Sequence, residues 1–121
     1  MAVAKPPLTV GNIKMIFGFL KYYDIADEAC LESMVRFKAL ANFYSEHRKH
    51  IIKRRENVLR LFGYCENDFD KELLKRRYIV CDEICDIAYS MAYSDRMICI
   101  FLKRALERLS ENTKNIAEFE Y

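Results

Sequence analysis

Two histidines and two cysteines are the residues of this chain whose types and spacing come closest to a metal site. His47 and His50 are three residues apart, and Cys81 and Cys85 are four apart. Two such pairs facing each other across helices would supply the four ligands of a tetrahedral zinc ion. However, these spacings are also those of ordinary helical neighbours, cysteine is often buried as a small apolar residue, and the basic residues around the histidines would repel a cation. Because no Cys-x-x-Cys knuckle is present, we expect no bound metal.

Catalytic signatures are absent from the sequence. No serine or cysteine lies in a nucleophile motif, no glycine-rich loop could cradle a phosphate, and no Glu-x-x-His pair of the kind found in metal-binding bundles occurs. We therefore expect a protein that is not an enzyme and that carries no cofactor.

Clustered cations are the strongest candidate for a binding site. They form two groups, which are Arg48, Lys49, Lys53, Arg54 and Arg55, and Lys75, Arg76 and Arg77. In a helical hairpin that turns near Cys65, residues 75–77 face residues 53–55, so that six cations share one level. Like charges repel, so this arrangement predicts a docking site for an acidic protein, an RNA backbone or an anionic lipid headgroup. A solvated basic face is the alternative interpretation.

Aromatic residues do not interleave with these cations in the sequence. Attraction to a nucleic-acid backbone or a lipid headgroup is therefore favoured over stacking of bases. The net charge of +2 also argues against a protein that coats nucleic acid over its whole surface.

Composition indicates the class of fold that must position these residues. The chain has 121 residues, of which 52% are hydrophobic, and only three are glycine and two are proline. Such sparse turn residues predict long helices, and the length predicts a single domain spanning residues 1–121. Five cysteines, an odd number, and the absence of a secretion signal favour an intracellular protein, cytoplasmic or nuclear. No apolar run approaches the roughly 18 residues of a transmembrane helix.

Hydrophobic periodicity predicts an all-α antiparallel bundle of three helices, or of four if the second helix breaks near Ser45. The first helix begins at Thr9 or Asn12 and ends near residue 23, after a mobile tail of residues 1–8. The second runs from about residue 24 to 62 with heptad-like, coiled-coil spacing. Gly63 is expected to end it, because glycine tolerates a left-handed conformation.

The third helix is expected to form a long hairpin with the second through a turn at Gly63 to Asn67. Asn67 is suited to cap this helix, which then continues to about Ser110 and is followed by a frayed tail at residues 112–121. Ser94 could cap a separate helix, but the apolar stripe keeps its phase across it. The hairpin register places Arg48 opposite residues 82 and 86, and the acids of residues 24–32 opposite the cations of residues 96–104.

These helices carry more apolar surface than a two-helix contact covers. The surplus residues predict an interface, and they are Leu40, Phe43, Ile52, Leu59, Ile87 and Phe101. The favoured hypothesis is therefore a protein–protein interaction module, acting as an adaptor, as a subunit of a larger assembly or as a homo-oligomer. The alternative hypothesis is a polyanion-binding protein that uses the cations at 48–55 and 75–77.

Overall fold

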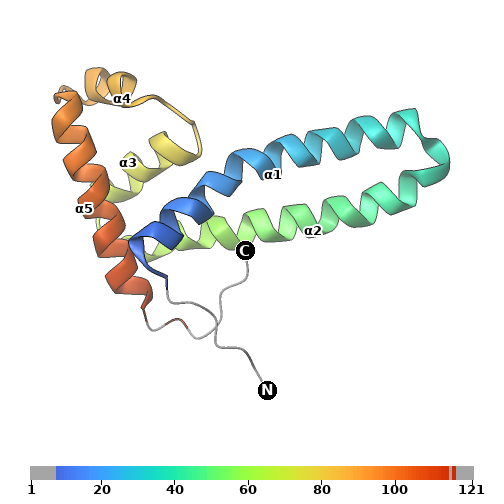
Figure 1. Cartoon of the computed structure of the whole chain (residues 1–121), viewed down its shortest axis with the longest axis horizontal. Coiled ribbons are helices and arrows are strands. Elements are labelled where there is room, and N and C mark those ends of the chain that lie inside the picture. The colour runs from blue at the N-terminus through green and yellow to red at the C-terminus, as the bar shows by residue number, and fades with distance from the viewer. Residues whose placement is uncertain (1–7, 115, 117–121) are drawn as a thin grey trace.

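The computed structural model describes residues 8–114 and 116, and over that part of the chain it forms helices joined by short connections, with no strand (Figure 1). An all-α helical bundle is thus confirmed, with five α-helices instead of three or four. The helices and the short 3₁₀ turns between them are α1 (Val10–Arg36), η1 (Lys38–Leu40), α2 (Ala41–Leu59), η2 (Arg60–Tyr64), α3 (Asp68–Tyr78), α4 (Ile84–Met91) and α5 (Asp95–Thr113).

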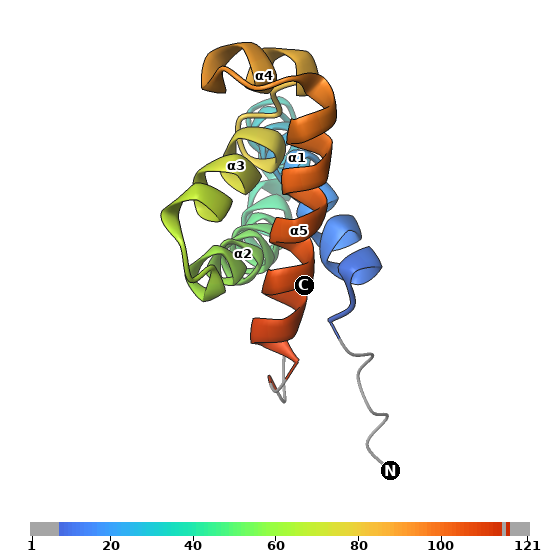
Figure 2. The ribbon, with the colours of Figure 1, turned by 90° about the vertical axis from the view of Figure 1, so that its left-hand side faces the viewer.

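The molecule divides into a compact body and a projecting arm. The arm, residues 22–56, consists of the outer parts of α1 and α2, which run antiparallel and are joined through η1 at the far end (Figure 1). The body contains the first half of α1, the end of α2, η2 and the helices α3, α4 and α5. Viewed from the body end, these three helices lie in front of the arm (Figure 2).

The hydrophobic core lies in the body. Phe17 of α1 stacks on Phe62 of η2 with ring centroids 4.6 Å apart, and its centroid lies 5.2 Å from that of Tyr78 in α3. Leu73, Ile87 and Ile98 bring α3, α4 and α5 to the same core and are fully buried. Burying large apolar side chains from six helical segments, Val58 of α2 among them, is the main source of stability in such a fold.

Local capping signals begin three of the helices. The Thr9 hydroxyl accepts a hydrogen bond from the Asn12 N–H at 3.2 Å, and the Asn67 side chain accepts one from the Asp70 N–H at 2.7 Å. Both caps confirm predictions made from the sequence. Ser94 caps α5 in the same way, so the signal that we discounted there does start a new helix.

The predicted long hairpin through residues 63–67 is not present. α1 continues without a break past residues 23 and 24, and the chain instead reverses at residues 37–40. The predicted helix 68–110 is interrupted at residues 79–83 and 92–94. Tertiary burial explains the difference, because these breaks let α1, α4 and α5 all reach one core, whereas two long helices would bury only one stripe each.

Gly63 does not adopt the left-handed conformation expected of it. It lies within η2, and no glycine of the described chain has a positive φ. The left-handed positions are instead Cys81, with φ of 65°, and Ala92, with φ of 59°, which ends α4. An exposed alanine can occupy this region, but at a steric cost that glycine avoids.

The predicted tails are only partly within the described structure. Residues 1–7, 115 and 117–121 lie outside the described residues. Leu8, which we placed in the mobile tail, is buried, and its carbonyl accepts a hydrogen bond from the Ser110 hydroxyl at 2.7 Å. At the other end α5 continues to Thr113, whose side chain is buried.

Candidate functional site

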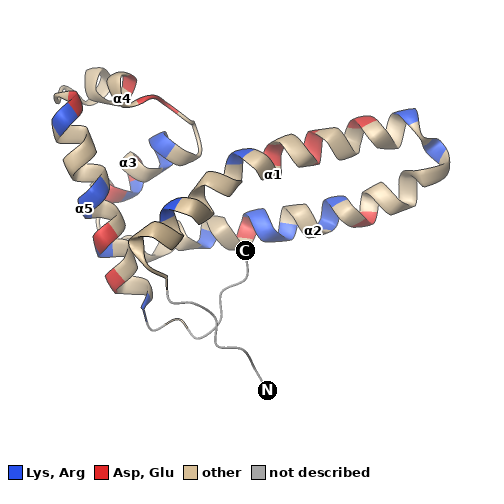
Figure 3. Cartoon of the chain, in the orientation of Figure 1, with Lys and Arg blue, Asp and Glu red and all other residues tan. Residues whose placement is uncertain are grey.

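Ion pairs connect α1 to α2 along one edge of the arm. Asp27 Oδ1 lies 2.6 Å from Arg48 Nε, and Asp24 Oδ1 lies 2.7 Å from Arg55 Nε. Figure 3 shows the acidic segments of α1 facing basic segments of α2 along the arm. The pairs are partly exposed, so each contributes about 0–1 kcal/mol. Their main effect is to neutralise two arginines and to set which residues of α1 lie beside which residues of α2.

The opposite edge of the arm holds a groove of about 560 Å³ between the same two helices. We call it the tyrosine groove, and its lining residues are Tyr22, Tyr23, Ala26, His47, His50, Ile51 and Arg54. No carboxylate is among them, and Tyr22 is 67% exposed. This edge therefore combines aromatic rings with a cation, whereas the other edge consists of neutralised pairs.

The aromatic character of this edge continues toward the end of the arm. The rings of Phe43 and His47 are parallel to within 2°, with centroids 6.5 Å apart. Phe43, His47, His50 and Arg54 follow one another along α2 at steps of four, three and four residues. At helical spacing these side chains lie along one face of α2.

The end of the arm exposes large apolar side chains. We call this surface the apolar tip, and its exposed fractions are Leu31 42%, Val35 75%, Phe37 49%, Leu40 50% and Phe43 65%. Arg36 and Lys38 are exposed among them, and the sequence contains no acid between Glu32 and Glu46. The tip therefore combines an apolar surface with positive charge.

The predicted level of six cations does not form. α3 packs along α1 and α5 and does not run alongside α2, so residues 53–55 do not lie opposite residues 75–77. Arg48 pairs with Asp27 and not with residues 82 and 86, and the acids at 24 and 27 bind α2 and not the cations of α5. The predicted register failed because the chain reverses at 37–40.

Most of the predicted cations have partners of their own. Lys49 pairs with Glu46, and Arg76 pairs with Glu72 and donates a hydrogen bond to the Ser90 hydroxyl. Arg77 donates to the Asp82 carbonyl at 3.0 Å. The cations that form no ion pair with a described residue include Lys53, Arg54 and Lys75, and of these only Arg54 lines the tyrosine groove.

The predicted apolar interface is also divided. Leu40 and Phe43 are exposed on the apolar tip, and Ile52 is half-buried on the arm. Leu59 and Phe101 are half-buried against the core, where Phe101 packs edge-to-face with Phe69 and Tyr93. Ile87 is fully buried in the core and offers no surface to a partner, which corrects its assignment to the interface.

The histidine and cysteine pairs lie in different parts of the molecule. His47 and His50 are on the arm, whereas Cys81 lies in the connection between α3 and α4 and Cys85 in the first turn of α4. One group of described residues places metal-binding atoms within 4.8 Å of one another, and it comprises Glu83, Cys85 and Asp86.

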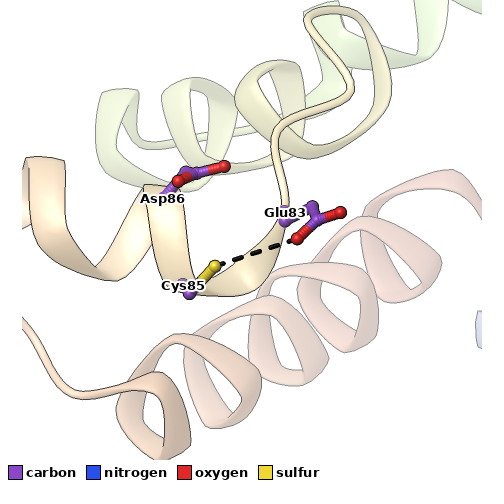
Figure 4. A group of neighbouring side chains, drawn as sticks. All are labelled: Glu83, Cys85 and Asp86. Atoms are coloured by element: carbon purple, nitrogen blue, oxygen red, sulfur yellow. Dashed lines mark hydrogen bonds between the residues drawn. The ribbon is translucent and has the colours of Figure 1, made fainter.

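Figure 4 shows this group at the start of α4, where the Cys85 thiol donates to Glu83 Oε2 at 3.9 Å. All three side chains are exposed. Two exposed carboxylates and a thiol at a helix start are common surface groups, and nothing else in the structure points to a ligand there.

The buried polar groups of the body serve the fold. Asp70 is the one buried carboxylate among the described residues, and it accepts hydrogen bonds from Arg108 Nε and Nη2 at 2.6 and 2.7 Å. This bidentate pair ties α3 to α5 and raises the pKa of Arg108. Burial raises the pKa of the nearby Cys65 thiol, which keeps it protonated and a poor nucleophile.

Sequence reasoning missed several residues of both arm surfaces. Val35 and Phe37 were placed inside a continuous helix, although the acid-free run around them was a visible signal of an unusual segment. Tyr22 falls near the end of the first predicted helix, and its position beside Arg54 had no signal in the sequence. Two residues 32 positions apart become neighbours only through the reversal at 37–40.

The fold and its surfaces define an all-helical protein with a two-helix arm that projects from a small helical body. Comparison of the chain with protein-family models, with curated proteins and with solved structures finds no match. Among the described residues, no helix is both long enough and apolar enough to cross a membrane.

Proposed function

We propose that this protein is a non-catalytic protein–protein interaction module that binds its partner through the apolar tip. The observation that carries the proposal is the exposure of five large apolar side chains at the end of the arm, far from the core (Figure 1). Exposed contiguous apolar surface is unfavourable in water and commonly marks an interaction site.

The chemistry of the tip indicates the kind of partner. Burial of a whole large apolar side chain contributes about 1.5–3 kcal/mol, so covering the remaining exposed parts of several side chains would support a specific contact. Arg36 and Lys38 lie among these side chains, and no acid lies between Glu32 and Glu46. A partner with an apolar surface bordered by acidic residues fits both features.

A second copy of the chain is one such partner. Glu28 and Glu32 are exposed on α1, one to two turns from Arg36, so antiparallel association of two tips could place opposite charges together. Light scattering over a range of protein concentrations distinguishes self-association from binding to another protein.

The test replaces two tip residues by acids. If the unchanged protein self-associates at tens of micromolar, the double variant Val35→Glu with Leu40→Glu should abolish that association. If the unchanged protein is a monomer, the variant should no longer bind an apolar fluorescent dye. Each substitution removes exposed apolar surface from the tip. The melting temperature should change little, since neither side chain is buried.

The matched control is Ile25→Glu with Tyr89→Glu, two exposed residues outside the tip with exposed fractions of 54% and 92%. The control should behave like the unchanged protein. A wild-type protein that stays monomeric and binds no dye, or a control that loses as much as the tip variant, would contradict the proposal.

A further inference from the structure

The tyrosine groove is an edge of the arm on which a cation has no carboxylate partner. Arg54 forms no ion pair with a described residue, and no acid lines the groove. Asp24 and Asp27, the acids of the adjoining turn of α1, are held on the opposite edge by Arg55 and Arg48. The one Lys or Arg that lines the groove is therefore not offset by a lining acid, although the whole chain carries only +2.

Aromatic rings accompany this positive charge. Tyr22 is 67% exposed at one side of the groove, and Phe43 and His47 lie with parallel rings farther along the same edge. From Phe43 to Arg54 the edge extends over eleven residues of helix, about 16 Å at 1.5 Å per residue. That length matches about five stacked nucleotides of one strand at about 3.4 Å each.

We propose that the tyrosine groove binds single-stranded nucleic acid, with Arg54 contacting a phosphate and Tyr22, His47 and Phe43 stacking on bases. Single strands are commonly bound by a cationic groove that carries aromatic rings, because every base has a face on which a ring can stack. The groove combines a cation with aromatic rings, although aromatic residues do not interleave with the cations in the sequence.

Other anionic ligands match fewer of these features. A lipid headgroup or a run of acidic residues would be attracted by Arg54, but neither has planar rings to stack on Tyr22 and the Phe43–His47 pair. A duplex buries its base faces between base pairs, so only a single strand can use the aromatic rings. With few cations, binding should be weak and salt-dependent, within the roughly 10⁻⁴–10⁻⁶ M range of non-specific binding.

This inference goes beyond the proposed interaction module because it uses different residues. Only Phe43 belongs to both surfaces, so the test leaves Phe43 unchanged. The double variant Val35→Glu with Leu40→Glu should lose the function of the tip and leave the groove unaltered. The two proposals can therefore fail separately.

The test measures fluorescence anisotropy of a short fluorescein-labelled oligouridylate at about 50 mM and about 200 mM salt. Arg54→Gln should weaken binding about three- to tenfold and reduce the slope of log affinity against log salt by about 0.7, the value for one phosphate contact on a single strand. Tyr22→Leu should weaken binding about fivefold or more with the slope unchanged, because it removes stacking and no charge. Tyr22→Phe keeps the ring and should bind as the unchanged protein does.

Matched controls are Lys53→Gln, a neighbouring exposed cation outside the groove, and Tyr89→Leu, an exposed tyrosine on α4. Both should stay within about twofold of the unchanged protein. All substituted side chains are exposed, so circular dichroism should show the same helicity throughout.

Several outcomes overturn the inference. Absence of binding at low salt removes it outright, and equal losses in Arg54→Gln and Lys53→Gln would show diffuse attraction without a groove. If polyglutamate or vesicles containing anionic lipid bind as tightly as the oligouridylate, and Tyr22→Leu changes nothing, the groove is a site for another acidic partner. A duplex of the same length that competes equally well would exclude stacking on bases.

Discussion

The body and the arm share the helices α1 and α2 but differ in what surrounds them. In the body, Ile13, Ile16 and Phe17 of α1 are fully buried, because η2, α3 and α5 cover the faces that α2 leaves open. Among the described residues of the arm, only Cys30 and Ile51 are buried apolar residues, because each helix of the arm can pack against only one other helix. Each of these two helices is therefore part of the core at one end and part of the surface at the other.

This difference separates stability from interaction. Nearly all the apolar burial that stabilises the fold lies in the body, so substitutions on the arm surface should cost little stability. The arm is held by one apolar contact line and two partly exposed ion pairs. Its exposed side chains are thus free to serve a partner or a ligand.

The largest expected effect compares one phenylalanine from each region. Phe17→Ala in the core should lower the free energy of unfolding by about 3–5 kcal/mol, because it removes a fully buried ring and leaves a cavity. Phe37→Ala, at a position 49% exposed on the tip, should change it by less than about 1 kcal/mol. Urea denaturation measures both.

If Phe17→Ala is unfolded without urea, Phe17→Leu keeps most of the volume and should give a smaller, measurable loss. Similar losses for Phe17 and Phe37 would mean that the tip is packed in solution and that the division into body and arm is wrong.

The next largest effect compares the two kinds of ion pair. Arg108→Ala in the body should cost about 1–3 kcal/mol, because it leaves the buried Asp70 carboxylate without its bidentate partner. Arg55→Ala in the arm should cost less than about 1 kcal/mol, since Asp24 is 58% exposed and water replaces the arginine. Thermal and urea unfolding of both variants give the comparison.

Replacing both partners in the body separates the ion pair from the space it fills. Asp70→Leu with Arg108→Met should recover part of the stability lost in Arg108→Ala, because no buried charge is then left unpaired. A double variant less stable than Arg108→Ala would show that the ion pair itself contributes more to stability than the cost of leaving Asp70 unpaired.

The smallest effect concerns backbone conformation in the body. Gly63→Ala should raise stability by about 0.4–1 kcal/mol, because its φ is not positive and an added Cβ meets no atom within 4 Å. The reverse change Ala92→Gly should also stabilise, by up to about 1 kcal/mol, since Ala92 has a φ of 59°. Destabilisation by Gly63→Ala would instead indicate that Gly63 adopts the left-handed conformation that we first expected there.

Local signals in the sequence predicted local features well. The Thr9 and Asn67 caps are present because each is a hydrogen bond between residues three positions apart. The all-helical class follows from apolar spacing and scarce glycine and proline, which act along a single segment. Ser94 carried the same kind of signal, and we discounted it only because the apolar stripe keeps its phase across it.

Long-range features were predicted poorly for the opposite reason. The reversal at residues 37–40 contains neither glycine nor proline, so no turn residue marks it. Its cause is the burial of α1 and α2 against each other and against the body, a gain that depends on residues far away in the chain. Because the register follows from where the chain reverses, the predicted facing of residues 53–55 with 75–77 failed with it.

The sequence by itself therefore determined that this protein is helical, where α1 and α3 begin, and which residues are apolar or charged. Tertiary structure alone decided which of these residues meet, because helical periodicity defines a face but not the partner of that face. Tyr22 and Arg54 share a groove, and Arg48 and Arg55 are neutralised on the other edge, only because the chain turns back at the end of the arm. The candidate site is thus a product of chain reversal and not of any sequence motif.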